Sequence, residues 1–356
     1  MKKKLLALLL VGAMTLSLAA CGNTDSEKEE KTSQKEEEPQ EDENSQDLKF
    51  GVLIRTFSDT YTTTVRTYMT QYLDEMGCSY EVMDANDSQA TQNEQLESFL
   101  SKGVDGIIVQ TVNVSASADI LKKCKEAEVP VLFFNHEPDD LSILEAEDST
   151  VFVGTSSPEA GYMQADLFMK FWNDTYDRNG DGVAQCVVFQ GSPESQEAFD
   201  RSQYCIEGAE DKGYKFEKLA DNYLCNWDAT LAQEAMTAFL GTHESDIEVV
   251  FCNNDSMAEG VIAALNAIGY NTGKEGDPEI LVFGVDATEA GMALIESGKM
   301  QGTVKQDGDT MAKVNVELMI RLANGMTREE AVADYGMEIY EGDNASVRIN
   351  YQEVSK

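Results

Sequence analysis

Short apolar runs alternate with amphipathic segments along most of the chain, beginning at residue 48. Residues 48–54 form a mostly apolar run of the kind found in a buried strand. The next segment places Val65, Met69 and Leu73 on one face of a helix, and Gly77 ends it. The alternation predicts further strands over 80–83, 106–109, 129–134, 151–154, 185–190, 215–220, 247–252, 280–285 and 301–305. It predicts further helices over 89–101, 120–127, 158–172, 197–212, 228–240, 256–268, 288–297 and 309–324.

Apolar strands that alternate with helices are typical of parallel sheets covered by helices on both faces. The body from residue 48 to residue 356 is large for a single core, which predicts two doubly wound, Rossmann-like α/β lobes. Ligands bind such sheets at the carboxyl ends of their strands. We therefore expect a cleft between the two lobes.

The N-terminus predicts an exported lipoprotein. Residues 1–4 are cationic, and residues 5–18 are apolar but too short to span a membrane comfortably. Leu18-Ala19-Ala20-Cys21 then predicts cleavage before Cys21 and lipid attachment at its sulfur; the alternative is an ordinary signal peptide with a chance cysteine. Residues 1–20 are thus a signal peptide, and residues 21–47, which are almost entirely polar, are an acidic disordered tether.

Charge and cysteine content exclude several classes of protein. A net charge of −38 argues against nucleic acid and anionic membrane surfaces as partners. The six cysteines after Cys21 show neither a CxxC metal pattern nor a dense disulfide framework. Cys186 and Cys252 lie in apolar runs and are expected to be core thiols, while disulfides among the six remain open.

Residues 177–185 carry the first part of an EF-hand calcium loop. Position 12 of the pattern is Val188 instead of glutamate, and it lies in an apolar run that predicts a strand. The missing carboxylate must therefore come from elsewhere in the chain; the alternative is an acidic surface turn that binds no ion. The expected oxygen ligands are Asp177, Asn179, Asp181, the main-chain carbonyl of Val183, and Gln185.

Polar side chains follow several of the predicted strands. Carboxylates, amides and an arginine at strand ends suit a polyhydroxylated ligand, because each hydroxyl both donates and accepts a hydrogen bond. Trp227 and Tyr61 can sandwich a pyranose ring. Taken singly, each residue has a structural alternative, such as a helix N-cap for Asp59. The set comprises Asp59, Tyr61, Asn135, His136, Glu137, Arg201, Asn253, Asn254, Asp255 and Asp286.

The chain resembles the galactose- and glucose-binding proteins of sugar ABC transporters, within the type I periplasmic-binding-protein family. The resemblance covers residues 48 to about 326. Its markers are the calcium loop, Asn93-Glu94-Gln95, Phe133-Phe134-Asn135-His136-Glu137-Pro138, Val153-Gly154-Thr155, Asn253-Asn254-Asp255-Ser256-Met257-Ala258, Phe283-Gly284-Val285-Asp286-Ala287 and Gly302-Thr303-Val304.

The resemblance implies roles for particular residues. It makes Glu248 the missing ligand of a structural Ca²⁺, and it gives sugar contacts at Asp59, Asn135, Arg201, Asn254 and Asp286, with Trp227 as one aromatic face. The chain departs from the family at Tyr61, Ser195, Glu197 and Gln306, where the family usually has Phe, His, Asp and Asn. These departures leave the hexose open, because sites built for particular hydroxyls reject analogues strongly.

The resemblance also implies a three-segment hinge, near 153–155, 301–306 and 336. The N-terminal lobe would comprise 48–153 plus 304–335, and the C-terminal lobe, with the calcium loop, 154–303 plus 336–356. The implied protein is a monomeric receptor, lipid-anchored on the outer face of the cell membrane. It closes on a monosaccharide and delivers it to an ABC permease.

Three other functions compete with this one. A hydrolase is disfavoured because neither His136 nor His243 lies near a recognisable nucleophile motif, and no P-loop or zinc motif occurs. A sensor that presents its closed form to a membrane kinase or chemoreceptor shares the same fold and stays open. A sugar-responsive repressor is disfavoured because a secretion signal precedes the body and no helix-turn-helix does.

Overall fold

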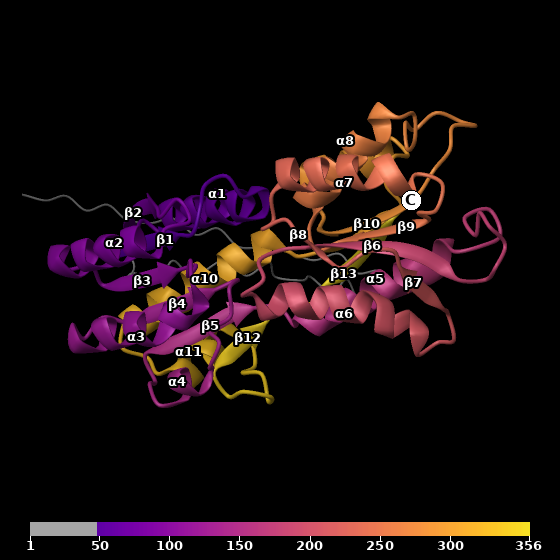
Figure 1. The fold of residues 1–356 in the computed structure, drawn as a ribbon. Helices are drawn as coiled ribbons and strands as arrows, with labels where there is room; N and C mark the ends of the chain where they lie inside the picture. The colour runs from indigo at the N-terminus through magenta and orange to yellow at the C-terminus, as the bar shows by residue number, and fades with distance from the viewer. Residues whose placement is uncertain (1–47) are drawn as a thin grey trace, which may run out of the picture. The chain divides into compact units, whose positions relative to one another are not determined.

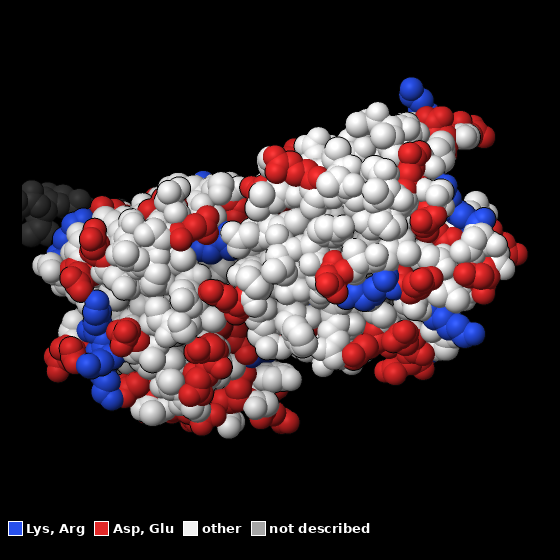
Figure 2. All heavy atoms as spheres, viewed as in Figure 1, with Lys and Arg blue, Asp and Glu red and all other residues white. Residues whose placement is uncertain are grey.

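The computed structural model describes residues 48–356. The predicted signal peptide, the predicted lipid attachment at Cys21 and the predicted tether lie outside the described residues. Within the described part, no helix combines the length and apolarity needed to cross a membrane. Acidic side chains are spread over the visible face of both halves, in keeping with the strongly negative charge (Figure 2).

The first half of the body is built on a six-stranded sheet in the order β12-β5-β4-β3-β1-β2, in which every pair is parallel. Its strands are β1 (Lys49–Ile54), β2 (Ser79–Asp84), β3 (Gly106–Val109), β4 (Val131–Phe134), β5 (Thr150–Gly154) and β12 (Ser346–Arg348). Its helices are α1 (Thr60–Glu75), α2 (Gln89–Lys102), η1 (Val114–Ala116), α3 (Ser117–Glu126), α4 (Ser142–Glu145), α10 (Gly308–Ala323) and α11 (Arg328–Tyr335). Figure 1 shows the late elements α10, α11 and β12 among the early ones.

The second half is built on a sheet in the order β13-β11-β10-β9-β6-β7, with β8 also paired to β6. Only β13, at the edge, is antiparallel to its neighbour. The strands are β6 (Ala184–Gln190), β7 (Phe216–Lys218), β8 (Tyr223–Leu224), β9 (Val249–Cys252), β10 (Leu281–Asp286), β11 (Gly302–Lys305) and β13 (Gln352–Ser355). The helices are α5 (Ser157–Phe171), α6 (Gln196–Glu210), α7 (Ala229–His243), α8 (Asp255–Ala267) and α9 (Glu289–Glu296).

Each sheet is covered on both faces, as the continuous apolar strands predict. In β1, Val52 and Ile54 belong to one buried cluster and the intervening Leu53 to another. In β9, Val250 and Phe251 likewise belong to different clusters. Successive strand side chains point to opposite faces, so strands packed on both faces have predominantly apolar sequences without alternation. The predicted fold class, two doubly wound α/β lobes, is confirmed.

The end of the chain differs from the expected lobe boundary. The predicted second lobe included residues 336–356, but β12 pairs with β5 in the first sheet. Only β13 joins the second sheet, where it pairs with β11. The third crossing between the lobes is therefore Ile349–Tyr351, and the expectation of a crossing near residue 336 is wrong. Gly336 instead ends α11 with a left-handed φ of 82°.

Three short segments connect the two sheets. Thr155 and Ser156 lie between β5 and α5, Gln306 and Asp307 lie between β11 and α10, and 349–351 lie between β12 and β13. Each segment leaves one sheet and enters the other half of the body within two or three residues. They run next to one another because β5 pairs with β12 and β11 pairs with β13.

Candidate functional site

A polar chamber lies where strands of the two sheets end opposite each other. Nine of the ten predicted sugar-binding residues line it; the exception is Ser195. The lining residues are Asp59, Tyr61, Asn135, His136, Glu197, Arg201, Trp227, Asn254, Asp286 and Gln306. Its free volume is about 20 Å³, which is room for about one water molecule. A larger guest therefore requires the lobes to part.

Three chamber residues sit on strained backbone. Asn135, Trp227 and Asp286 have φ values of 62°, 67° and 119°, a region that residues with a Cβ rarely adopt. Such strain persists where the surrounding structure over-determines it, and it clusters at functional sites. Gly191 adds a related constraint, because a Cβ there would lie 2.3 Å from the indole of Trp227. Strained backbone conformations at these positions therefore place the three side chains in the chamber.

Arg201 is the centre of the second-lobe wall. Its side chain is only 2% exposed and projects from α6. Nη1 donates to the carbonyl of Asn253 at 2.8 Å, and Nη2 donates to Gln306 Oε1 at 2.9 Å. An ion pair with Glu197, one helical turn earlier, balances the charge. A buried guanidinium with several fixed acceptors is held in one orientation.

Three buried donors in the chamber have no hydrogen-bond partner among the described residues. They are Arg201 Nε, Trp227 Nε1 and Gln306 Nε2. Leaving a buried donor unpaired costs roughly 1–3 kcal/mol, so native structures seldom keep several together. A ligand rich in acceptor oxygens would satisfy them.

The first-lobe wall is held by local hydrogen bonds. Asp59 caps α1 by accepting from the Thr62 N–H at 2.7 Å. It is therefore both a helix N-cap and a residue of the chamber. Gln110 donates to Asn135 Oδ1 at 2.7 Å. This bond leaves the amide nitrogen of Asn135 as the group available to a ligand.

The chamber also shifts the titration of its acids. Burial raises the pKa of Asp286 well above its usual range, against the opposing effect of Arg201. Burial likewise raises the pKa of Glu197, and again Arg201 opposes the shift. Burial, aided by Arg55, lowers the pKa of His136 to about 4, so this ring is neutral at physiological pH. With Nδ1 at 2.9 Å from the Thr111 carbonyl and donating to it, Nε2 is an acceptor.

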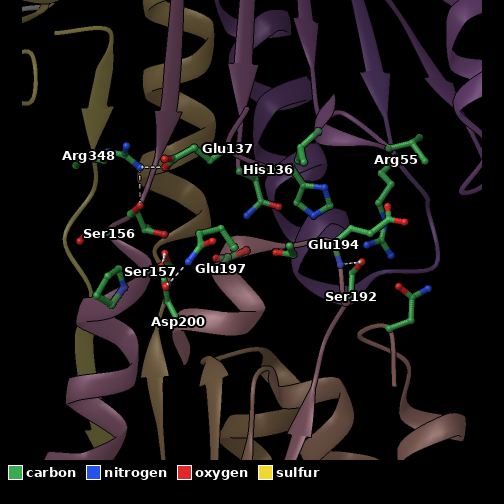
Figure 3. Close-up of a pocket in the computed structure, with 18 of the residues that line it drawn as sticks. Arg55, His136, Glu137, Ser156, Ser157, Ser192, Glu194, Glu197, Asp200 and Arg348 are labelled. Carbon is green, nitrogen blue, oxygen red and sulfur yellow. Dashed lines mark hydrogen bonds and ion pairs between the residues drawn. The ribbon is translucent and has the colours of Figure 1, made fainter. Parts of the chain in front are cut away.

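A second hollow of about 380 Å³ adjoins the chamber and shares Asn135, His136 and Glu197 with it. Figure 3 shows His136 and Arg55 on one side of this vestibule and Ser157 and Asp200 on another. Ser195 lines the vestibule, where it caps α6 by accepting from the Ala198 N–H at 3.3 Å. On another side of the cleft the lobes touch through the Thr60 and Ser256 hydroxyls, 2.7 Å apart.

The predicted calcium loop lies in the second half, between α5 and β6. Asp177 Oδ1 accepts from the Gly180 N–H at 2.8 Å, and Asn179 Oδ1 accepts from the Asp181 N–H at 2.9 Å. Glu248, which is 1% exposed, lies beside the loop and accepts from the N–H groups of Arg178 (2.5 Å) and Gln185 (3.1 Å). The six proposed ligands thus include side chains from two parts of the chain.

The donor set suits a hard cation, although its carboxylates are not gathered into a ready-made cluster. Among residues 48–356, no group of three or more His, Cys, Asp or Glu side chains is arranged to hold a metal. All the proposed loop donors are oxygens, as Ca²⁺ prefers. Gln185 Oε1 is buried without a hydrogen-bond partner in the described structure, which is the state expected of an oxygen that binds an ion.

Several residues around the chamber were not predicted. His136 belongs to the polar strand-end set, but no sugar contact was predicted for it, although it lines both hollows. Gln110, which supports Asn135, and Tyr351, which bonds Arg201, were missed. The ending of a buried strand at Val109 is a signal that could have found Gln110. The sequence offers no comparable signal for Tyr351.

The chain matches known proteins over most of its length. A family model described as "Periplasmic binding protein domain" matches residues 50–327. The D-galactose/methyl-galactoside binding periplasmic protein MglB of Haemophilus influenzae is 33% identical over 315 residues, which cover 87% of this chain and 90% of that protein. The ribose import binding protein RbsB of Bacillus subtilis is 21% identical over 302 residues, covering 83% and 88%.

Solved structures show the same fold. An ABC transporter solute binding protein from Bacillus halodurans with bound myo-inositol has a TM-score of 0.68 at 24% identity, covering 88% of this chain and 96% of that one. A periplasmic solute binding protein from Actinobacillus succinogenes with bound D-allose has a TM-score of 0.71 at 20% identity, covering 86% and 97%. These likenesses support the two-lobed architecture.

Proposed function

The chain belongs to the periplasmic binding protein family, and we propose that it is an extracytoplasmic receptor that captures a galactose- or glucose-like hexose between its lobes and delivers it to an ABC permease. The observation that carries the proposal is the chamber, where Asp286, Arg201 and Trp227 meet first-lobe groups. The named relatives are binding and import proteins, which supports capture over catalysis.

The chemistry of the chamber matches a sugar ring. A hydroxyl between a carboxylate and an amide or guanidinium donates to the first and accepts from the second. Asp59 and Asp286 supply acceptors on opposite walls, while Arg201 Nε, Gln306 Nε2 and Trp227 Nε1 supply unpaired donors. The apolar faces of a pyranose would pack on the Trp227 indole, and Tyr61 lies in the same chamber.

Capture proceeds by closure of the lobes. A hexose cannot enter a space of about 20 Å³, so the open form must admit it before the walls meet. Closure would exclude water and strengthen the hydrogen bonds to the charged groups. A permease that binds only the closed form would then distinguish loaded from empty receptor.

The choice of hexose rests on the relative that binds D-galactose and on the residues where this chain departs from the family. Glu197 and Gln306 are longer than the family's usual residues, and both reach Arg201. Ser195 lies outside the chamber, in the vestibule. The vestibule also leaves room for a small substituent on the sugar, so methyl glycosides belong in any ligand panel.

Isothermal titration tests the proposal directly. The panel would contain D-galactose, D-glucose, their methyl glycosides, D-ribose, D-allose and myo-inositol. We expect saturable heat with at least one aldohexose and a weaker response to ribose. Asp286→Asn should abolish the response, whereas the exposed Asp221→Asn on the same lobe should retain it. Absence of heat with every hexose would overturn the proposed ligand class.

We also propose that Cys21 carries a lipid that anchors the receptor on the outer face of the cell membrane. The support is the sequence at residues 18–21. Cells fed a labelled palmitate analogue should label the wild-type protein and not Cys21→Ala. The variant should be released in soluble form. Equal labelling of both proteins would contradict the anchor.

A structural Ca²⁺ in the loop at 177–185 is the third element of the proposal. Asp177, Asn179, Asp181, the Val183 carbonyl, Gln185 and Glu248 would hold it. The buried, unpartnered Gln185 Oε1 and the nearness of Glu248 to the loop support this assignment. The ion would stabilise the second lobe without touching the sugar.

A further inference from the structure

Each of the three crossings between the lobes contributes one side chain to a single hydrogen-bonded cluster around Arg201. Gln306 comes from the second crossing and accepts from Arg201 Nη2 at 2.9 Å. Tyr351 comes from the third, and its hydroxyl accepts from the same Nη2 at 2.7 Å. Thr155, from the first crossing, donates to the Tyr351 hydroxyl at 2.6 Å. The hinge and the chamber therefore share one set of bonds.

The cluster is buried, and more acceptors surround Arg201 Nη2 than this nitrogen has protons to donate. Tyr351 is 3% exposed and Arg201 is 2% exposed. Arg201 Nη2 carries two protons, yet Glu197, Gln306 and Tyr351 all lie within hydrogen-bond reach of it. The Tyr351 hydroxyl accepts from two donors, Arg201 Nη2 and Thr155 Oγ1.

Geometry makes this cluster sensitive to the hinge angle. Arg201 is fixed to α6 of the second lobe, and Tyr351 directly precedes β13 and packs in a core cluster of that same lobe. Thr155 instead directly follows β5 of the first sheet. A change of dihedral angles in the crossings during opening moves Thr155 relative to the tyrosine, and a displacement of about 1 Å breaks their bond of 2.6 Å. Opening would then leave the tyrosine without the partner that fixes its hydroxyl beside Arg201.

We propose that Tyr351 is a positioning residue that makes the orientation of the ligand-binding Arg201 conditional on the hinge being closed. The proposal rests on the proposed function for its ligand but on the Thr155–Tyr351–Arg201 contacts for its mechanism. In the closed form the tyrosine holds the guanidinium toward the sugar. In the open form the guanidinium loses that support, so the affinity for the sugar increases as the lobes close.

The decisive variant is Tyr351→Phe, which removes one oxygen and keeps the ring. We expect it to bind the hexose about tenfold more weakly, the loss expected for one hydrogen bond to a charged group. Most of the change should appear as faster dissociation, because the closed state is the one destabilised. Small-angle scattering of the sugar-free protein should show a larger radius of gyration than wild type.

Three further variants separate this mechanism from a general loss of structure. Thr155→Val removes the second partner of the tyrosine and should weaken binding in the same direction by a smaller factor, whereas Thr155→Ser keeps the hydroxyl and should recover most of that loss. Tyr162→Phe removes a hydroxyl from a ring that is 43% exposed on α5, and it should bind and scatter as wild type does.

Two results would overturn the inference. One is unchanged dissociation and unchanged scattering in Tyr351→Phe. The other is equal loss in Thr155→Val and Thr155→Ser, which would mean that the hydroxyl is irrelevant. If the wild-type protein bound no hexose, the proposed ligand class would be wrong. The scattering of sugar-free Tyr351→Phe against wild type would still decide whether the tyrosine holds the hinge closed.

Discussion

The two walls of the chamber are built in different ways. The second-lobe wall is buried and cross-bonded: Arg201, Asn254 and Asp286 are each at most 6% exposed. On the first-lobe wall Asp59 and Asn135 are only half-buried, and each is held by one local bond. A preorganised surface binds with less loss of side-chain freedom. From this difference we expect a sugar to dock on the second lobe before the first lobe closes over it.

The largest effect should come from the preorganised wall. Asp286→Asn replaces a carboxylate with a group of the same shape that accepts fewer hydrogen bonds, and we expect the hexose affinity to fall by about a hundredfold or more. Titration calorimetry measures the loss, and a thermal melt checks that the variant is folded. A loss of less than threefold would show that the second lobe does not dominate binding.

A first-lobe substitution should cost less. Asn135→Ala removes one amide from a half-buried position, and we expect about a tenfold loss of affinity. Because this wall engages on closure, the loss should lie in dissociation, with association nearly unchanged. Gln71→Ala, exposed on α1, is the matched control in stopped-flow measurements. A slower association in Asn135→Ala would indicate that the first lobe makes the first contact.

Acid should weaken binding through the second wall. Sugar hydroxyls donate to the ionised forms of Asp286 and Glu197, so binding favours ionisation and lowers both raised pKa values. Affinity is therefore complete above the sugar-free pKa values of the two acids and falls as pH drops through them. His136, whose pKa is lowered to about 4, stays neutral above that value. Calorimetry in two buffers counts the protons released; a flat profile would contradict the assignment.

Removing calcium should affect affinity least. The loop lies outside the chamber, so EDTA should lower the melting temperature and leave hexose affinity within about twofold. Bound ion adds about 2.7 kcal/mol to the unfolding free energy when free Ca²⁺ is about a hundredfold above Kd. Asp181→Ala should melt at the same temperature with and without EDTA. A wild-type melting curve that is unchanged by excess chelator would contradict a structural role for calcium.

The fold was predictable because strands buried on both faces have continuously apolar sequences, whereas helices buried on one face have a periodic apolar pattern. That contrast fails at the end of the chain, where β12 and β13 have only three and four residues. Such short strands leave no readable period, so their assignment to different sheets depends on tertiary pairing.

The chamber was predictable to the extent that polar residues follow apolar strands. Asp59 and Asp286 fit that rule, and Trp227 was expected as an aromatic face for a pyranose ring. Ser195 did not fit, because the hydroxyl caps α6 and the short side chain stays in the vestibule. Tyr351 could not be predicted, because nothing in the sequence distinguishes a tyrosine buried in a crossing segment from any other buried aromatic residue.

The last strands of the chain complete both sheets at once. β12 forms one edge of the first sheet and β13 one edge of the second, and only three residues separate them. A nascent polypeptide still held at its C-terminus would therefore display two unfinished β-edges, which invite pairing with other chains. Pairing of residues 346–356 would complete both sheets together, so a premature stop codon near residue 345 should yield an aggregating product.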